Sequence, residues 1–165
     1  VKEGVTSAKG KYIGFLDADL DLSAKHFGSF LPRIEQGDCS VVIGSKMHKD
    51  SKLDYPPIRR LFSLCFYVLL KLLFGLKVKD TQTGVKLFEG ELIKSVVLKQ
   101  RVKGYAFDVE QLALCATKGA KIAQMPIVLE YRREQSFGRI HFKDIWRMFT
   151  DTIKVWWNLR VKKNY

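Results

Sequence analysis

The chain has 165 residues, of which 47% are hydrophobic, and it contains no low-complexity tract. This length is ample for one packed domain and short for two, so we expect a single hydrophobic core. Three cysteines, an odd number, lie in apolar stretches at Cys39, Cys65 and Cys115. Their spacing excludes a zinc site, and we interpret them as buried thiols in a reducing compartment.

The net charge of +12 is concentrated in two blocks of the sequence. Residues 45–103 carry 13 basic and five acidic side chains, and residues 130–165 carry nine basic and four acidic ones. The other segments are close to neutral. Such blocks suit phosphates, nucleic acid or an anionic membrane surface, and a solvated basic face is the simpler alternative.

The first ten residues are typical of a helix that ends near Gly10. The chain starts at Val1, without an initiator methionine or a signal peptide. We therefore interpret it as the C-terminal portion of a longer protein. Residues 11–16 are a short apolar run rich in β-forming residues, which predicts a buried strand.

Three aspartates, Asp17, Asp19 and Asp21, follow directly where this strand is expected to end. If the extended backbone persists, alternate residues point the same way, and the three carboxylates turn toward one point. Mg²⁺ or Mn²⁺ prefers such oxygen ligands and shares them with substrate phosphates, so the pattern predicts a divalent metal site. The simpler alternative is an acidic turn before a helix, with Asp21 or Ser23 as N-cap.

Two other carboxylate motifs fit the same stretch less well. A calcium loop requires Gly at its sixth position and Glu at its twelfth, but Leu22 and Gly28 stand there, which argues against an EF-hand. A phosphatase with an aspartyl nucleophile typically has Thr or Val where this chain has Asp21, which weakens that interpretation without removing it.

The next segments show helix and strand signals in turn. Ser23 offers an N-cap for a helix whose apolar positions keep a helical period to residue 36, and Gly37 is a suitable C-cap. Residues 39–43 are a second apolar strand. A long polar loop then runs to the double proline at 56–57, which fixes the entry to the next helix.

Residues 61–76 are the most apolar stretch of the chain. As a helix they would span about 24 Å at 1.5 Å per residue. A membrane span needs about 20 uninterrupted apolar residues, and Lys71 interrupts this stretch, so a crossing helix is not expected. We expect either a core helix or a helix that lies in the headgroup region of a membrane.

Residues 80–131 are predicted to alternate between strands and helices. It contains a polar turn at 80–84, a strand at 85–88, helices at 89–98 and from about 107 to Gly119, and a strand at 122–131. Asp108 stands near the start of the second of these helices, where the helix dipole favours an anion and where it would be a good cap. Pro126 places the last strand at an edge of the sheet.

Residues 142–160 form the clearest periodic segment. The apolar stripe comprises Phe142, Ile145, Trp146, Phe149, Ile153, Trp156 and Trp157, and the opposite face comprises Lys143, Arg147, Asp151, Lys154 and Asn158. An ordinary packed amphipathic helix would explain the stripe alone. The three tryptophans and the basic tail at 160–163 favour a helix in a membrane interface, with Trp146, Trp156 and Trp157 facing the lipid.

Three motifs of this sequence resemble those of a known enzyme family. Residues 9–21 resemble the strand and D-x-D motif of family 2 glycosyltransferases with the GT-A fold, and residues 80–88 and 105–110 narrow the resemblance to dolichyl-phosphate glucosyl- and mannosyltransferases. It covers nearly the whole chain. It implies an α/β fold with a Rossmann-like mixed sheet flanked by helices, lacking its first β-α units. Residues 1–141 would be the C-terminal part of this domain, and residues 142–165 an amphipathic, membrane-interfacial helix with a basic tail.

The resemblance also implies roles for charged residues. Asp17 and Asp19 would hold Mg²⁺ or Mn²⁺ on the diphosphate of a nucleotide sugar, and Asp21 matches a position that is often Gln in the mannosyl branch. The remaining implied contacts, to the acceptor phosphate or the diphosphate, are Lys46 where the family often has Arg, Arg59 or Arg60 with Ser63, and the loop residues Arg132, Arg133, Ser136 and Arg139.

The implied reaction is an inverting transfer of a hexose from UDP-glucose or GDP-mannose to a polyprenyl or dolichyl phosphate. It would take place on the cytoplasmic face of a membrane, of the endoplasmic reticulum in a eukaryote or the plasma membrane in a prokaryote. Asp108, Glu110 and Asp80 are candidates for orienting the sugar hydroxyls or acting as a base, and Asp108 is preferred. Because the family's nucleobase contacts precede Val1, we expect the chain alone to be inactive.

Two further classes stay open beside this one. The first is a family 2 glycosyltransferase that acts on another glycan or lipid acceptor. The second is a non-catalytic basic module that binds a membrane or nucleic acid, although the sequence shows no nucleic-acid recognition motif.

Overall fold

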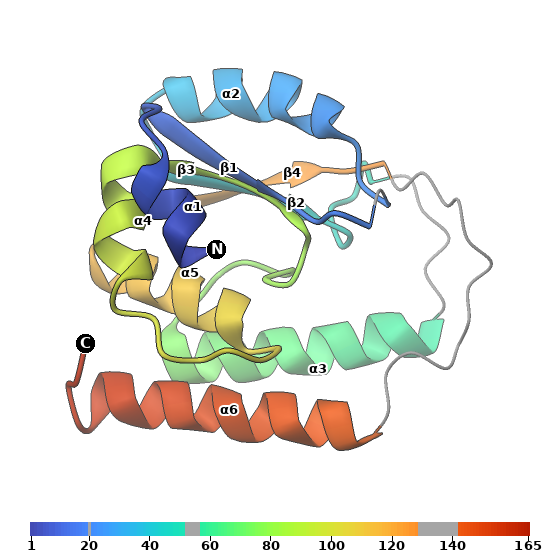
Figure 1. Ribbon diagram of the computed structural model, residues 1–165. Helices are drawn as coiled ribbons and strands as arrows, with labels where there is room; N and C mark the ends of the chain where they lie inside the picture. The colour runs from blue at the N-terminus through green and yellow to red at the C-terminus, as the bar shows by residue number, and fades with distance from the viewer. Residues whose placement is uncertain (20, 52–56, 129–141) are drawn as a thin grey trace.

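Figure 1 shows the chain as a computed structural model, which describes all residues except 20, 52–56 and 129–141, and also leaves the side chains of 57–59 and 142 undescribed. A four-stranded sheet lies at its centre. The strands are β1 (Tyr12–Leu16), β2 (Val41–Ser45), β3 (Val85–Glu89) and β4 (Ile122–Pro126), in the order β1-β3-β2-β4. The sheet is mixed, as predicted, and β4 lies at its edge, as Pro126 indicated.

The directions of the strands bring several chain segments to one edge of the sheet. β3 is antiparallel to both β1 and β2, and β2 is parallel to β4. In this register Leu16 lies opposite Val85, and Ser45 lies opposite Pro126. The carboxyl ends of β1, β2 and β4 therefore meet the start of β3. This is the edge at which open α/β sheets hold their ligands.

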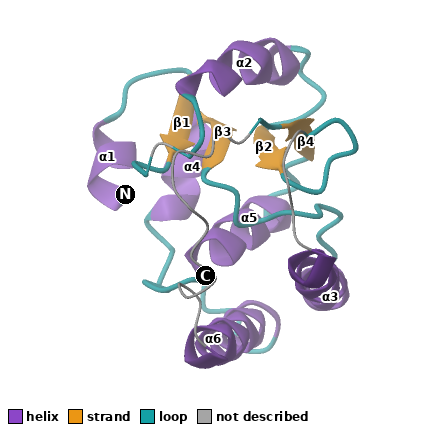
Figure 2. Ribbon diagram, turned by 90° about the vertical axis from the view of Figure 1, so that its right-hand side faces the viewer, coloured by secondary structure: helices purple, strands orange, loops and turns teal. Residues whose placement is uncertain are grey.

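Helices cover both faces of the sheet. They are α1 (Lys2–Ser7), α2 (Phe27–Glu35), α3 (Pro57–Phe74), α4 (Gly90–Val97), α5 (Phe107–Thr117) and α6 (Phe142–Arg160), with a 3₁₀ turn η1 (Ala24–His26) before α2. Figures 1 and 2 show α2 on one face and the other helices on the opposite face. In the same views α3 and α6 run in nearly the same direction, farthest from the sheet.

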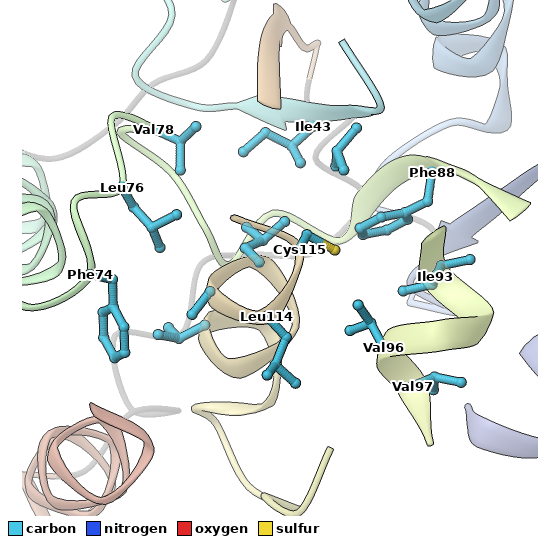
Figure 3. Packing of buried hydrophobic residues seen from close by; sticks show 14 of the residues in the cluster. Ile43, Phe74, Leu76, Val78, Phe88, Ile93, Val96, Val97, Leu114 and Cys115 are labelled. Carbon is cyan, nitrogen blue, oxygen red and sulfur yellow. The ribbon is translucent and has the colours of Figure 1, made fainter. Parts of the chain in front are cut away.

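The larger core cluster fills the space between the sheet and α4 and α5, and α3 and α6 close it (Figure 3). Ile43 and Phe88 point into it from the strands. A smaller cluster lies under α2 and contains Val42 and Leu87, the neighbours of those two residues in sequence. This alternation is the period of two that a sheet buried on both faces requires.

Most predicted boundaries hold within a few residues, and the turn signals explain why. Ser23 caps η1 by accepting a hydrogen bond from the Lys25 N–H at 3.3 Å, so the predicted helix starts as a 3₁₀ turn. Gly37 and Gly119 follow α2 and α5 with φ of +76° and +79°, a backbone region that favours glycine.

The apolar helix α3 takes part in the core, which was one of the two alternatives for its sequence, and a place in the headgroup region of a membrane stays a prediction. Its Leu70 and Phe74 are buried in the larger core cluster. Another set of its side chains is exposed, namely Leu61, Phe62, Leu64, Val68 and Leu72. Cys65 is exposed as well, so the expectation that all three cysteines are buried is wrong for this one.

The helix α6 packs with a different face from the predicted stripe. Thr152 and Val155 are fully buried against the core, whereas Trp146 is 68% exposed and Trp157 48% exposed. Trp156 is partly buried and packs against the core cluster, which corrects its assignment to a lipid-facing surface. Among the described residues, no helix is long and apolar enough to cross a membrane.

The stability of the fold should depend on the contact between α5 and the core. Leu112 on α5 is fully buried, and Leu98, after α4, is 68% exposed. We expect Leu112→Ala to lower the free energy of unfolding by about 2–5 kcal/mol, because it leaves a cavity. Leu98→Ala should change it by less than about 0.5 kcal/mol. Urea denaturation of both variants measures the difference, and equal effects would contradict this packing.

Candidate functional site at the sheet edge

Asp17 lies at the edge where β1 ends and β3 begins. Its backbone N–H donates a hydrogen bond to the Gly84 carbonyl at 2.9 Å. A β-carbon at Gly84 would overlap the Asp17 carboxylate. Only glycine therefore leaves room for this side chain at position 84.

The Asp17 carboxylate is surrounded by other charged groups. Burial raises the pKa of Asp17 above its ordinary value, the nearby Lys86 ammonium lowers it, and the charges of Asp19 and Asp108 raise it. Lys46 lowers the pKa further, by a smaller amount. These five side chains, from four separate segments, therefore lie within electrostatic reach of one another and form what we call the edge cluster.

Lys86 is the member of the edge cluster that was not predicted. It lies on β3, is almost completely buried, and donates hydrogen bonds of 2.7 Å to the Asp108 carboxylate and to the Thr83 carbonyl. A lysine within the apolar strand sequence Val-Lys-Leu-Phe was the available signal. A buried lysine requires a charged partner, but sequence alone does not identify it.

Asp108 lies in the first turn of α5, as expected, and its carboxylate pairs with Lys86. No side-chain hydrogen bond caps this helix. About one third of the Asp108 side chain is exposed although its carboxylate pairs with Lys86. Of the three predicted catalytic carboxylates, Asp108 is the one that the structure brings to Asp17.

Glu110 has a structural position instead of the predicted catalytic one. It is fully buried and accepts hydrogen bonds of 3.0 Å from the backbone N–H groups of Arg101 and Val102. It also accepts a hydrogen bond of 2.5 Å from the Tyr165 hydroxyl. Burial, and then this contact with Glu110, raise the pKa of Tyr165. The Glu110 carboxylate fastens the end of the chain to α5 and has no free face for a substrate.

Asp80, the third predicted catalytic carboxylate, shapes its own turn. It accepts hydrogen bonds from the backbone N–H groups of Lys46, at 2.9 Å, and Gln82, at 3.3 Å. It therefore connects the end of β2 to the 80–84 turn. A role in orienting a sugar stays a prediction.

The three aspartates after β1 do not converge as predicted. The strand ends at Leu16, and the backbone then turns, so that the Asp21 N–H donates to the Asp19 carboxylate at 3.2 Å. Among the described residues, no three His, Cys, Asp or Glu side chains are placed to hold a metal ion together. The described residues therefore do not form the three-carboxylate group, and a role of Asp21 as a third metal ligand stays a prediction.

Asp17 and Asp19 remain suitable as a pair for a divalent ion. Mg²⁺ is commonly held by one or two carboxylates together with substrate phosphates and water. The Asp17 carboxylate, in the space that Gly84 leaves open, provides hard oxygen ligands of this kind. The donor chemistry at the edge therefore fits Mg²⁺ or Mn²⁺.

The predicted phosphate-binding residues are described only in part. Lys46 follows β2 and belongs to the edge cluster. Arg60 is exposed on the first turn of α3, and Ser63, one turn later, is half-buried and has a bonding partner. The side chain of Arg59 and the four loop residues Arg132, Arg133, Ser136 and Arg139 lie outside the described part of the chain.

One contact links the edge to α6. The Gln82 side-chain amide donates to the Met148 sulfur at 2.8 Å and to the Tyr105 carbonyl at 3.3 Å. The 80–84 turn, which approaches Asp17 through Gly84, therefore also contacts the C-terminal helix.

The fold is similar to that of solved structures. The chain is similar to glucosyl-3-phosphoglycerate synthase from Mycobacterium tuberculosis in complex with uridine diphosphate, with a TM-score of 0.61 at 15% identity. The alignment covers 95% of this chain and 52% of that one. The same enzyme with Mn²⁺, uridine diphosphate and phosphoglyceric acid gives a TM-score of 0.64 at 15% identity, covering 95% of this chain and 51% of that one. This likeness confirms the predicted GT-A type of fold.

Curated relatives are similar in sequence as well. The dolichyl-phosphate beta-glucosyltransferase of Dictyostelium discoideum is 30% identical over 133 residues, which are 77% of this chain and 41% of that protein. The enzyme of the same name from Saccharomyces cerevisiae is 30% identical over 141 residues, 77% of this chain and 42% of that protein. The chain thus spans about two fifths of these relatives. Residues 1–97 match the family described as Glycosyl transferase family 2, and the chain belongs to that family.

Proposed function

We propose that the protein containing this chain is a metal-dependent, inverting hexosyltransferase that uses a polyprenyl or dolichyl phosphate as acceptor. The edge cluster is the observation that carries this proposal. It places the Asp17 and Asp19 carboxylates beside the Lys86–Asp108 ion pair at the ligand-binding edge of the sheet. The similarity to dolichyl-phosphate glucosyltransferases favours UDP-glucose as the donor over GDP-mannose.

The carboxylates at the edge divide into two proposed roles. Asp17 and Asp19 would hold Mg²⁺ or Mn²⁺, which neutralises charge on the leaving diphosphate. Asp108, held by its 2.7 Å bond to Lys86, would accept a hydrogen bond from a hydroxyl of the sugar. Lys46 adds a positive charge near the same carboxylates, where it can contact a phosphate.

The reaction then needs little acid-base chemistry from the protein. An acceptor phosphate oxygen forms the new bond to the anomeric carbon while the bond from that carbon to the diphosphate breaks. This single displacement inverts the configuration at the carbon. A phosphate is already anionic near neutral pH, so its attack requires no strong general base. Orientation and charge stabilisation are therefore the contributions expected of these residues.

The exposed apolar faces of α3 and α6 support a membrane location for this reaction. Large apolar side chains are exposed on both helices: Leu61, Phe62, Leu64, Val68 and Leu72 on α3, and Ile145, Trp146, Phe149 and Trp157 on α6. Both helices lie on the side of the sheet away from α2 (Figure 2). Tryptophan and basic residues together favour the interface of an anionic membrane. We propose the cytoplasmic face, where the donor nucleotide would be available.

The transfer reaction can be tested in the protein that contains this chain. Membranes with polyprenyl phosphate, labelled UDP-glucose or GDP-mannose, and Mn²⁺ or Mg²⁺ should yield label in the organic phase. EDTA should abolish the transfer, and Asp19→Ala should lower it about 100-fold through loss of a metal ligand.

Asp21→Ala is the matched control for this assay, because Asp21 is the neighbouring aspartate that the proposed metal pair does not include. It should stay within a few-fold of the unmodified protein. Full activity of Asp19→Ala would refute the proposed metal site. Label that reaches only a soluble glycan would refute the lipid acceptor.

The raised pKa of Asp17 predicts a stability cost of the site at neutral pH. Between the ordinary aspartate pKa and the raised one, the folded state binds the proton more tightly, so stability falls as pH rises through this window and stays lower above it. Asp17→Asn should therefore raise the Tm at pH 7 in metal-free buffer by a few degrees at most. The gain should vanish near about pH 3, where the carboxyl is protonated in both states.

Circular dichroism melts between pH 3 and pH 8 measure this effect. Asp21→Asn removes the same charge outside the edge cluster and should leave the pH profile of the Tm unchanged. A lower Tm for Asp17→Asn than for the unmodified chain at pH 7 would contradict the proposed stability cost of the Asp17 charge.

Membrane binding should depend on the exposed tryptophans of α6. The double variant Trp146→Ser, Trp157→Ser should weaken binding to anionic vesicles about tenfold or more, since each ring removes apolar area from water when it inserts. Leu31→Ser is the control, because Leu31 is 41% exposed on α2, on the other side of the sheet. Cosedimentation with vesicles gives the partition coefficients. Equal loss in both variants would contradict an orientation with α6 toward the lipid.

A further inference from the structure

Gln82 is a polar side chain beside the edge cluster to which the proposed reaction gives no role. It lies in the 80–84 turn between α3 and β3 and is half-buried. We propose that Gln82 is a positioning residue, whose side chain fixes the separation between Asp17 and Asp108. This inference rests on the proposed function, because the metal ion and the sugar are the proposed ligands of these two carboxylates.

The 80–84 turn holds the Asp17 side of the edge cluster in place. Its Gly84 carbonyl accepts the hydrogen bond of 2.9 Å from the Asp17 N–H, and its Thr83 carbonyl accepts the bond of 2.7 Å from the Lys86 ammonium. A β-carbon at Gly84 would overlap the Asp17 carboxylate, so the turn and the carboxylate are in close contact. A small shift of this turn therefore moves the surroundings of Asp17 and of Lys86 together.

The Gln82 side chain connects this turn to the loop that leads into α5. Its amide donates a hydrogen bond of 3.3 Å to the Tyr105 carbonyl, three residues before Asp108. That loop is itself a tight turn, in which the Phe107 N–H donates to the Gly104 carbonyl at 3.0 Å. The hydrogen bond of Gln82 thus joins the 80–84 turn to the segment that carries Asp108.

The helix α6 supports the same connection from the side away from the sheet, since α5 lies between the sheet and α6 (Figures 1 and 2). The Gln82 amide also donates to the Met148 sulfur at 2.8 Å. Three residues later on α6, Asp151 lies against the loop before α5, because a β-carbon at Gly104 would be 3.4 Å from its carboxylate. Thr152 is fully buried and keeps this face of α6 against the core. The position of the Gln82 amide is therefore set from two sides.

The hydrogen-bonding capacity of the amide indicates that Gln82 acts through other residues. A glutamine side chain has two N–H donors, and a single nitrogen carries both. In Gln82 this nitrogen donates to two protein partners, Tyr105 and Met148. The side chain therefore orients the edge instead of donating to the reacting atoms. Such orientation matters, because misplacing a reacting group by about 1 Å can lower a rate about 100-fold.

Steady-state kinetics of the protein that contains this chain test the role of Gln82. Gln82→Met removes both N–H donors and keeps a side chain of similar length. We expect kcat to fall about 10- to 100-fold and KM for the nucleotide sugar to stay within about threefold, because the misplaced groups act after the donor has bound. Gln36→Met is the matched control, since Gln36 is exposed at the end of α2, on the other face of the sheet. It should leave kcat and KM within about twofold of the unmodified protein.

Hydrogen exchange of the same protein gives a readout that needs no reaction. Gln82→Met should speed exchange of the Asp17 and Phe107 amides about five- to tenfold, because a hydrogen bond that holds both segments is lost. The Val42 amide in β2 should exchange as before. Gln82→Asn retains the amide on a side chain that is one methylene shorter. It should show the same exchange and the same kinetic split, and it decides the question if Gln82→Met fails to fold.

The two readouts separate this inference from the proposed function. If the unmodified protein transfers no sugar from either donor, the proposed function fails, and exchange alone decides whether Gln82 couples the two segments. The inference is overturned if exchange at Asp17 and Phe107 is unchanged, or if Gln36→Met has the same effects as Gln82→Met. In an active protein it is also overturned by an unchanged kcat, and a rise in KM alone would place Gln82 in donor binding instead.

Discussion

The ion pair between Lys86 and Asp108 is the interaction on which the edge of the sheet depends. Removing a lysine ammonium from water is costly, and a buried charge is tolerated only when it is paired and hydrogen-bonded. Lys86 meets this condition with two bonds of 2.7 Å, to Asp108 on α5 and to the Thr83 carbonyl in the turn before β3. One buried cation thus holds together a strand, a helix and a turn. It also reduces the repulsion among the carboxylates of Asp17, Asp19 and Asp108.

The space around the backbone at this edge is also restricted. A side chain at Gly84 would occupy the space of the Asp17 carboxylate, and one at Gly44 would overlap Ile127, Val85 and Thr83. The edge is therefore a place where strands approach closely and small residues decide what fits. Ligand oxygens can reach such an edge because the protein leaves volume there while it keeps the charged groups fixed.

Sequence reasoning predicted the architecture well because its signals are local. Apolar runs marked the strands, Gly37 and Gly119 marked helix ends through their positive φ, and Pro126 marked the edge strand. The errors concern contacts between distant segments. Helical period identified an apolar stripe on α6, but the fully buried residues of this helix, Thr152 and Val155, lie outside that stripe, and of the three predicted membrane-facing tryptophans Trp156 packs against the core. The partners of Lys86 and Glu110 are set by tertiary packing, and the turn after Leu16, in which the Asp21 N–H bonds the Asp19 carboxylate, left no clear sequence signal.

The two acidic residues of α5 fix the rotation of this helix about its long axis. Asp108 and Glu110 are two positions apart, so they project about 200° from each other around the helix axis. Asp108 is held by Lys86 on one side, and Glu110 is held by the backbone of 101 and 102 and by Tyr165 on the other. The helix cannot roll about its long axis without breaking one of these attachments. The direction in which Asp108 points is thus set partly by the last residue of the chain, behind the helix that carries it.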